Sequence, residues 1–173
     1  MNDMSNWIVR ANPDQFRIHD FIRDYGFVEY RQTDKWEEGD IIYLYITGDD
    51  AKRVEYKMIV ERANIPYNES FDDRAYSRLN PPNTWTDTDK AVRFKLIKRV
   101  ENNELSYKKL CEHGYVGKNG RPLPMTSNRR LSDETSSYIE KYFKSQTYNY
   151  GQDNYYIPND WRPKRSAIRT HQQ

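Results

Sequence analysis

The chain has very few of the residues on which covalent cross-links, metal clusters and membrane anchors depend. Its 173 residues include one cysteine, Cys111, and three histidines. A single cysteine allows no disulfide within the chain, and so few ligands allow no zinc cluster of the usual kind. No apolar run approaches the ~20 residues of a membrane helix, and the first residues lack the basic and apolar stretches of a signal peptide. We therefore expect a cytoplasmic protein with no metal, no cofactor and no membrane partner.

Motifs of enzyme active sites are equally scarce. The chain contains no Walker, Rossmann or nuclease motif. Its carboxylate pairs, such as Glu37 with Glu38, are sequence neighbours in turns or loops, whereas paired catalytic carboxylates converge from separate parts of a fold. Cys111 and His113 stand near an expected helix end, where a structural cysteine is more common than a nucleophile. We expect no catalytic activity in this chain, and any nuclease activity would lie in another domain or subunit.

Aromatic side chains and local charge are what the sequence does provide. It contains 15 Tyr, 6 Phe and 4 Trp, and tyrosine combines a flat apolar ring with a polar tip that suits stacking on planar ligands. The net charge is only +2, but acids dominate 14–73, while bases gather in 93–99, 118–130 and 162–169. Basic patches on a nearly neutral protein favour selective binding over a general coating of DNA.

Hydrophobic periodicity predicts an α+β fold. Strands are expected at 7–11, 27–31, 41–47, 54–62 and 92–100, with the third central because it is apolar at nearly every position. Helices are expected from Asp14 to about Tyr25, over 105–111, and from Ser132 to Phe143; Asp14 and Ser132 are candidate caps, and Gly26 ends the first helix. Strands in meander order with peripheral helices predict a mixed, barrel-like sheet.

Two stretches fall outside this periodic pattern. Residues 64–89 are rich in Pro, Asn and Asp, and a loop of that length in a compact domain is usually functional or mobile. After Lys144 the sequence loses its period and is dominated by Tyr, Asn and Pro. The prediction is one domain over 1–145, followed by a tail or linker over 146–173.

Three motifs, taken in order, resemble the YTH and EVE domains of the PUA-like superfamily. They are N-W-I-V-R-A-N-P-D-Q-F from Asn6, W-E-E-G-D-I-I-Y-L-Y from Trp36, and V-R-F-K-L-I-K-R-V-E-N-N-E-L from Val92. The similarity covers about 6–143, although 64–89 matches poorly and the tail does not match. It implies a PUA-like mixed β-barrel of about five to six strands that encloses one flipped-out modified base between aromatic side chains.

The resemblance also implies a base-binding pocket made of Trp85, Tyr30, Asn12 and Trp36. Trp85 stands among Thr, Asp and Asn, where packing alone gives little reason for a tryptophan, although it could be a loop anchor. Tyr30 is the choice for the second wall on chemical grounds, Phe27 and Val28 remain open for this position, and a role in the core of the strand is the alternative.

The remaining two pocket candidates have simple structural alternatives. The Asn12 amide offers both a donor and an acceptor to a base edge, whereas an asparagine before Pro13 is also explained by turn chemistry. Trp36 could form a pocket wall, but packing beneath the Gly39-Asp40 turn is the favoured interpretation.

A second set of candidates would contact phosphate. The residues are Arg31, Lys118, Arg121, Ser127, Arg129 and Arg130, and Asn128 could add a hydrogen bond. No acid lies between Lys118 and Arg130, and this stretch directly precedes an expected helix N-terminus, which attracts anions. The alternative is an ordinary solvated basic loop.

The sequence thus predicts a protein that binds nucleic acid with a modified base. The resemblance favours DNA carrying methylcytosine or methyladenine, bound by base flipping, and a role as the recognition module of a modification-dependent restriction system with a fused or separate motor or nuclease. Two alternatives remain. One is an RNA-binding, YTH-like reader of methylated adenine, and the other is a stand-alone PUA-like scaffold for a small ligand or protein partner.

Overall fold

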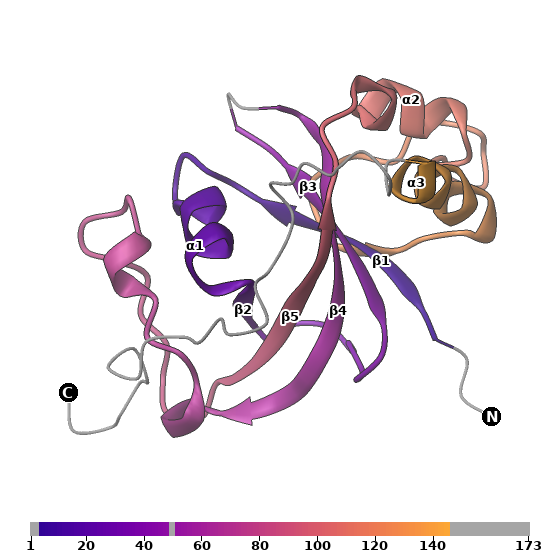
Figure 1. Cartoon of the computed structure of the whole chain (residues 1–173). Coiled ribbons are helices and arrows are strands. Elements are labelled where there is room, and N and C mark those ends of the chain that lie inside the picture. The colour runs from indigo at the N-terminus through magenta and orange to yellow at the C-terminus, as the bar shows by residue number, and fades with distance from the viewer. Residues whose placement is uncertain (1–3, 49–50, 146–173) are drawn as a thin grey trace.

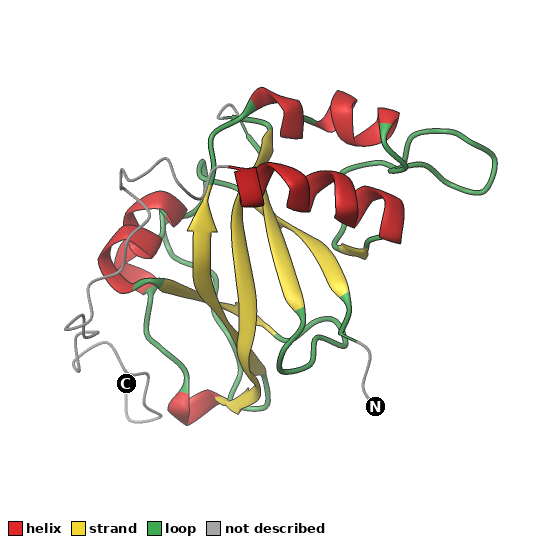
Figure 2. Cartoon of the chain, turned by 45° about the vertical axis from the view of Figure 1, so that its right-hand side comes forward, coloured by secondary structure: helices red, strands yellow, loops and turns green. Residues whose placement is uncertain are grey.

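The computed structural model describes residues 4–48 and 51–145, which form one curled sheet with helices on both of its sides (Figures 1 and 2). The expected tail, 146–173, lies outside the described residues. The elements are β1 (Asn6–Ala11), α1 (Ile18–Tyr25), β2 (Phe27–Arg31), β3 (Ile41–Ile46), β4 (Arg53–Pro66), η1 (Tyr67–Glu69), η2 (Arg74–Tyr76), β5 (Lys90–Arg99), η3 (Asn103–Leu105), α2 (Tyr107–Glu112), β6 (Arg129–Arg130) and α3 (Asp133–Ser145). The predicted α+β class is confirmed.

The strand order is β2-β5-β4-β3-β1-β6. β1 runs parallel to β3, and the other pairs are antiparallel, so the sheet is mixed as predicted. The expected meander order is wrong for the first two strands, because β1 pairs with β3 while β2 lies at the opposite edge beside β5. The sheet has two edges and does not close into a barrel. A gap therefore separates the edge strand β2 from β1. Across this gap, the Tyr30 hydroxyl donates to the Arg10 carbonyl oxygen at 2.8 Å, which joins β2 to β1.

Two hydrophobic cores lie on opposite faces of this sheet. β3 is central, as predicted, and divides its side chains between them: Ile42, Leu44 and Ile46 enter the inner core, whereas Tyr43 and Tyr45 enter the outer one. The inner core is rich in aromatic side chains and includes the apolar face of α1. The outer core is covered by α2 and α3, which lie together on one side of the sheet in Figure 2. No helix of the described residues is long and apolar enough to cross a membrane.

The helix ends follow the expected caps with one exception. Gly26 ends α1 at φ 75° and donates to the Ile22 carbonyl, and the Ser132 hydroxyl accepts the Thr135 N–H at the start of α3. Asp14 does not cap α1, which begins only at Ile18. The cause is a turn in which the Asn12 carbonyl accepts the N–H groups of residues 15 and 16, so the chain enters the helix one turn later than expected.

The predicted irregular stretch 64–89 begins later than expected, because β4 continues to Pro66. Segment 67–89 has little regular structure, but it is attached to the body of the protein. Phe71 is buried in the inner core, and its N–H donates to the Glu29 carboxylate at 2.7 Å. Tyr76 donates its hydroxyl to Asp24 on α1 at 2.6 Å. These contacts hold the segment against α1 and β2, beside the gap in the sheet.

Candidate functional site

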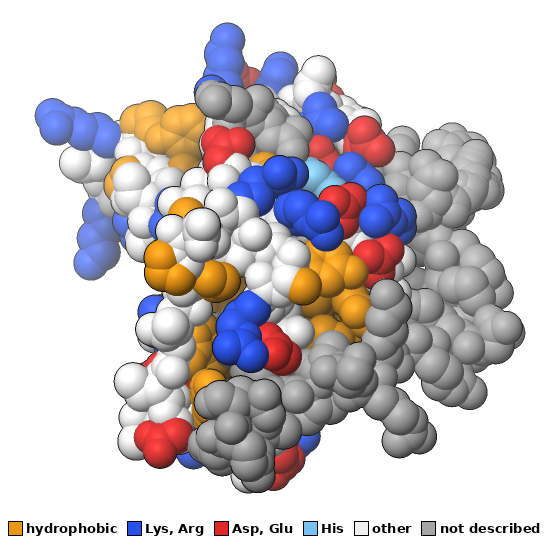
Figure 3. All heavy atoms as spheres, turned by 90° about the vertical axis from the view of Figure 1, so that its left-hand side faces the viewer, with side chains coloured by type: hydrophobic (Ala, Val, Ile, Leu, Met, Phe, Trp, Pro, Cys, Tyr) orange, Lys and Arg blue, Asp and Glu red, His pale blue; other side chains and the backbone are white. Residues whose placement is uncertain are grey.

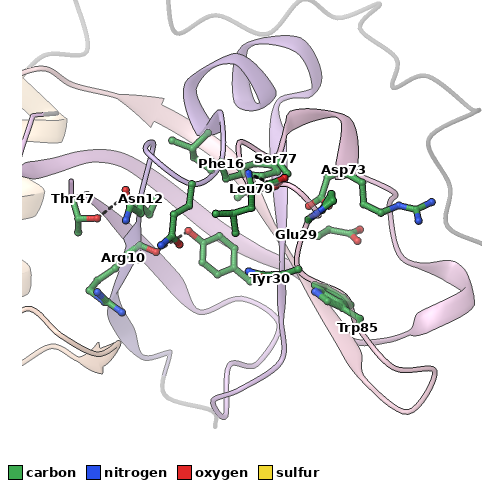
Figure 4. Close-up of a pocket in the computed structure, with 17 residues that line it drawn as sticks. Arg10, Asn12, Phe16, Glu29, Tyr30, Thr47, Asp73, Ser77, Leu79 and Trp85 are labelled. Carbon is green, nitrogen blue, oxygen red and sulfur yellow. Dashed lines mark hydrogen bonds between the residues drawn. The ribbon is translucent and has the colours of Figure 1, made fainter. Parts of the chain in front are cut away.

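A cavity of about 400 Å³ lies at the gap between β1 and β2, within the size range of small-molecule sites. The ends of β1 and β3, the turn before α1, the edge of β2 and segment 67–89 form its walls (Figure 4). Its lining includes Arg10, Asn12, Phe16, Glu29, Tyr30, Thr47, Asp73, Ser77, Leu79 and Trp85.

Three of the four predicted pocket residues line this cavity, and they come from three separate segments. Asn12 follows β1, Tyr30 belongs to β2, and Trp85 lies near the end of segment 67–89. The assignment of Trp36 to the pocket is wrong, because Trp36 does not line the cavity. It is 1% exposed and packs edge-on against Trp7, with ring centroids 6.0 Å apart, so its role is in the core.

Tyr30 serves both the strand and the cavity. Its ring packs against Phe94 with centroids 5.2 Å apart, while its hydroxyl is engaged by the Arg10 carbonyl. Burial raises the pKa of the Tyr30 phenol well above its ordinary value of 10.0, so the hydroxyl remains a donor at physiological pH. The wall that Tyr30 contributes is therefore neutral and fixed in place.

Asn12 is held by turn chemistry but keeps one polar group free. Its Oδ1 accepts the Asp14 N–H at 2.9 Å, as the turn interpretation expected. Its amide nitrogen has no hydrogen-bond acceptor within the described part of the chain, and it can donate to a ligand. Gly48 fits closely beside this turn, because a Cβ there would stand 2.8 Å from Asn12 Oδ1. A glycine with φ +75° is thus required next to the cavity.

The acidic Glu29 side chain has a structural role. Its carboxylate is 1% exposed and accepts two hydrogen bonds from the Arg93 guanidinium, at 2.6 and 2.8 Å, besides the one from Phe71. The same guanidinium stacks over the Phe27 ring, 4.3 Å from its centroid. A buried charge with this many partners is stable where it is, so the carboxylate fixes segment 67–89 to β2 and leaves the cavity to other groups.

Several lining residues were not anticipated from the sequence. Arg10 gave one signal, because it is the charged position in an otherwise apolar strand. Phe16 falls within the helix expected from Asp14 to about Tyr25, but it precedes α1 and lines the cavity. Asp73, Ser77 and Leu79 gave no signal beyond the length of their loop, because their place depends on where Phe71 and Tyr76 attach.

The predicted phosphate contacts divide into two places. Arg31 is exposed on β2, where Asp89 stands 3.8 Å from its guanidinium and offsets part of its charge. Lys118, Arg121 and Ser127 are exposed in segment 118–130. That segment projects from the helical side of the molecule (Figure 2).

Segment 118–130 ends beside the first strand. Arg129 and Arg130 form β6 and pair with Ile8 and Trp7. The Arg130 guanidinium lies over the Trp7 ring, 5.1 Å from its centroid. One residue earlier, Asn128 Oδ1 accepts the Arg10 N–H at 3.0 Å. The basic segment and the cavity therefore meet at Arg10, whose exposed guanidinium has no acidic partner within the described residues.

The charge on the neighbouring face is mixed. Figure 3 shows Lys and Arg side chains beside Asp and Glu on the side that carries α1 and segment 67–89, with hydrophobic patches between them. The ion pairs of Arg23 with Asp20 and of Arg74 with Asp72 account for part of this pattern. In the described ranges, no group of three or more His, Cys, Asp or Glu side chains is placed to hold a metal ion.

Comparisons with known proteins give structural similarity only. No family model matches the chain, and no curated protein matches it. A hypothetical protein from Leishmania major is 17% identical, with a TM-score of 0.55 over 84% of this chain and 98% of that one. A Pseudomonas putida protein is 15% identical, with a TM-score of 0.55 over 79% and 98%. An ASCH protein from Zymomonas mobilis is 15% identical, with a TM-score of 0.46 over 80% and 96%. At such identities the first two similarities concern the fold alone.

Proposed function

We propose that this chain binds nucleic acid with a modified base, held in the cavity between β1 and β2. The observation that carries the proposal is the meeting of Tyr30, Asn12 and Trp85 in one cavity of about 400 Å³. The motif resemblance assigned these residues to a base pocket from three distant parts of the sequence. A mixed, curled sheet with a cavity at its opening is also the kind of scaffold that a PUA-like resemblance implies.

The residues of the cavity match the energetics of holding a base outside its stack. A flipped base loses its stacking, and aromatic walls return about 1–3 kcal/mol per base. A methyl group on the base adds roughly 0.8 kcal/mol when its carbon is buried. The neutral Tyr30 phenol and the free Asn12 amide nitrogen suit an uncharged ring with polar edges better than a phosphate.

The phosphates would lie outside the cavity, along Arg10 and segment 118–130. Arg10 is exposed at the mouth, and Lys118 and Arg121 are exposed in a segment without acids. The preferred ligand is DNA with methylcytosine or methyladenine. The chain would act as a recognition module that has no catalytic activity and serves a motor or nuclease in another domain or subunit. Support for that role comes from the resemblance to EVE and YTH motifs.

Fluorescence-anisotropy titration tests the proposal. Matched duplexes carry no modification, 5-methylcytosine, 5-hydroxymethylcytosine or N6-methyladenine, and RNA oligonucleotides of equal sequence separate DNA from RNA binding. We expect one modified base to bind more tightly than its unmodified partner. Trp85→Ala should weaken that binding about 5- to 150-fold, whereas Thr84→Ala, an exposed neighbour that does not line the cavity, should leave it unchanged. Equal binding of all duplexes by wild type and Trp85→Ala would refute the base pocket and favour a scaffold for another ligand.

A further inference from the structure

The free edge of β2 presents main-chain groups to the cavity. In an antiparallel ladder, hydrogen-bonded pairs alternate with non-hydrogen-bonded pairs. Leu96 N–H donates to the Gly26 carbonyl at 2.9 Å, and Gln32 N–H donates to the Lys90 carbonyl at 2.8 Å. The register between these two points is continuous. The even-numbered residues of β2 therefore bond to β5, and the odd-numbered residues direct their N–H and C=O groups away from it.

Glu29 is the odd-numbered β2 residue that lines the cavity. It is only 5% exposed, and β2 is an edge strand, so no ladder partner stands on its other side. Neither its N–H nor its C=O has a hydrogen-bond partner in residues 4–48 and 51–145. Buried main-chain groups without partners are rare in folded proteins. Here the groups are a donor and an acceptor that point together away from β5, on a residue that lines the cavity.

We propose that the Glu29 main chain reads the pairing edge of the bound base. This inference rests on the function proposed above and narrows the ligand. Glu29 N–H would donate to a ring nitrogen or carbonyl oxygen, and Glu29 C=O would accept an N–H from the same edge of the ring. Because Tyr30 follows directly in the strand, its ring lies beside the same opening (Figure 4). The Tyr30 ring would thus pack on the face of the base, while the main chain of the preceding residue, Glu29, bonds to its edge.

The proposal assigns a class of modification. Adenine and cytosine each carry a donor next to an acceptor on the pairing edge. A single methyl on C5 of cytosine or on N6 of adenine leaves an N–H and the ring acceptor in place. Two methyl groups on the exocyclic nitrogen remove every N–H, and replacing the ring nitrogen by carbon removes the acceptor. The site should accept bases modified off the pairing edge, or singly methylated on the exocyclic amine, and reject bases that have lost either partner.

Base analogues and amide hydrogen exchange test this on the full chain. The duplex whose modified base binds best is compared with duplexes containing its N,N-dimethylated and deaza analogues, N6,N6-dimethyladenine and 1-deazaadenine or the cytosine equivalents. We expect each analogue to bind at least about tenfold more weakly, as the loss of one buried hydrogen bond implies. In NMR hydrogen exchange, the Glu29 amide should be protected when the modified duplex binds. The Phe27 amide, which points from the same edge but does not line the cavity, should not change.

The outcomes separate the two proposals. If no modified duplex is preferred, the base pocket itself fails and this inference fails with it. If a modified duplex is preferred but the N,N-dimethyl analogue binds within roughly twofold of it, or Glu29 exchange stays the same, the edge contact alone is overturned. Protection of Glu29 together with rejection of both analogues would establish the contact.

Discussion

Segments 67–89 and 118–130 are both long connections with little regular structure, yet they are attached to the sheet in different ways. Segment 67–89 buries Ser70 and Phe71 completely, whereas no residue of segment 118–130 is fully buried. The first is fixed by an aromatic side chain in the core, and it can therefore shape a cavity wall. The second keeps Lys118, Arg121 and Arg130 exposed to solvent, where a charge costs little to hold, while Arg129 near its end is half-buried. Segment 67–89 therefore shapes the cavity, and segment 118–130 supplies exposed positive charge.

The largest expected effect tests the shape-giving segment. Phe71→Ala removes a ring that is 2% exposed and packs against Phe21, Tyr25 and Phe27. We expect the free energy of unfolding to fall by about 3–5 kcal/mol, the range for deleting a buried phenylalanine. Urea denaturation measures the change. Leu123→Ala, at a half-buried position of segment 118–130, is the matched control and should cost clearly less. Equal losses of unfolding free energy in the two variants would show that the two segments do not differ in how firmly they are attached.

The second prediction concerns the charged tie between segment 67–89 and β2. Glu29→Gln keeps the size of the side chain but removes the charge that Arg93 pairs with. We expect a loss of about 2–3 kcal/mol, since hydrogen bonds to charged groups are worth about 1.5–3 kcal/mol and the Arg93 guanidinium is partly exposed.

A double-mutant cycle with Arg93→Gln isolates the pair. A coupling energy near zero, measured by denaturation of all four proteins, would mean that the carboxylate does not hold the segment. The corresponding tie of segment 118–130 is neutral, from Asn128 to the Arg10 N–H, so Asn128→Ala serves as the comparison and should cost about 1 kcal/mol.

The sequence predicted local structure far better than long-range placement. The apolar run of β3, the Gly26 stop and the Ser132 cap are properties of a few adjacent residues, and all three are confirmed. The parallel pairing of β1 with β3 joins segments about thirty residues apart, and nothing in either segment specifies it. Asp14 misled for the same reason, because the helix start is set by the turn at Asn12 and by the distant Tyr76 carbonyl, which accepts the Arg17 N–H.

The residues of the candidate site show the same difference between local and long-range information. Trp85, Asn12 and Tyr30 were assigned to the pocket by the motif resemblance, and the polar neighbours of Trp85 added a second reason for its choice. Leu79 and Ser77 could not be found, because they reach the cavity only through the attachment of segment 67–89. The Glu29 main chain leaves no trace in the sequence at all, since any residue has the same N–H and C=O. Its exposure to the cavity depends on strand order and register.

A third prediction sharpens the charge-giving role of segment 118–130. Lys118→Gln and Arg121→Gln, made singly, should each reduce the slope of log affinity against log salt by about 0.9 for duplex DNA, one phosphate contact apiece. Preference for the modified base and stability should stay the same, because both side chains are exposed. Lys108→Gln, an exposed cation on α2, is the control with the same change of charge. If it lowers the slope as much, the segment is an ordinary solvated loop.

The smallest expected effect on stability concerns Arg10, where the cavity and segment 118–130 meet. The Arg10 main chain accepts the Tyr30 hydroxyl on the cavity side and donates to Asn128 on the basic side. Tyr30→Phe and Asn128→Ala each remove one hydrogen bond, and each should lower the free energy of unfolding by about 0.5–1.5 kcal/mol. Their effects on binding should differ.

Tyr30→Phe keeps the aromatic wall but releases β2 from β1, so the gap is less tightly defined and discrimination between modified and unmodified bases should fall while the salt slope is kept. Asn128→Ala loosens segment 118–130 and should reduce the salt slope while discrimination is kept. Titrations of both variants at two salt concentrations would show this crossing pattern. The same change in both variants would mean that Arg10 couples the cavity and the basic segment into a single unit, and that shape and charge are not separable in this protein.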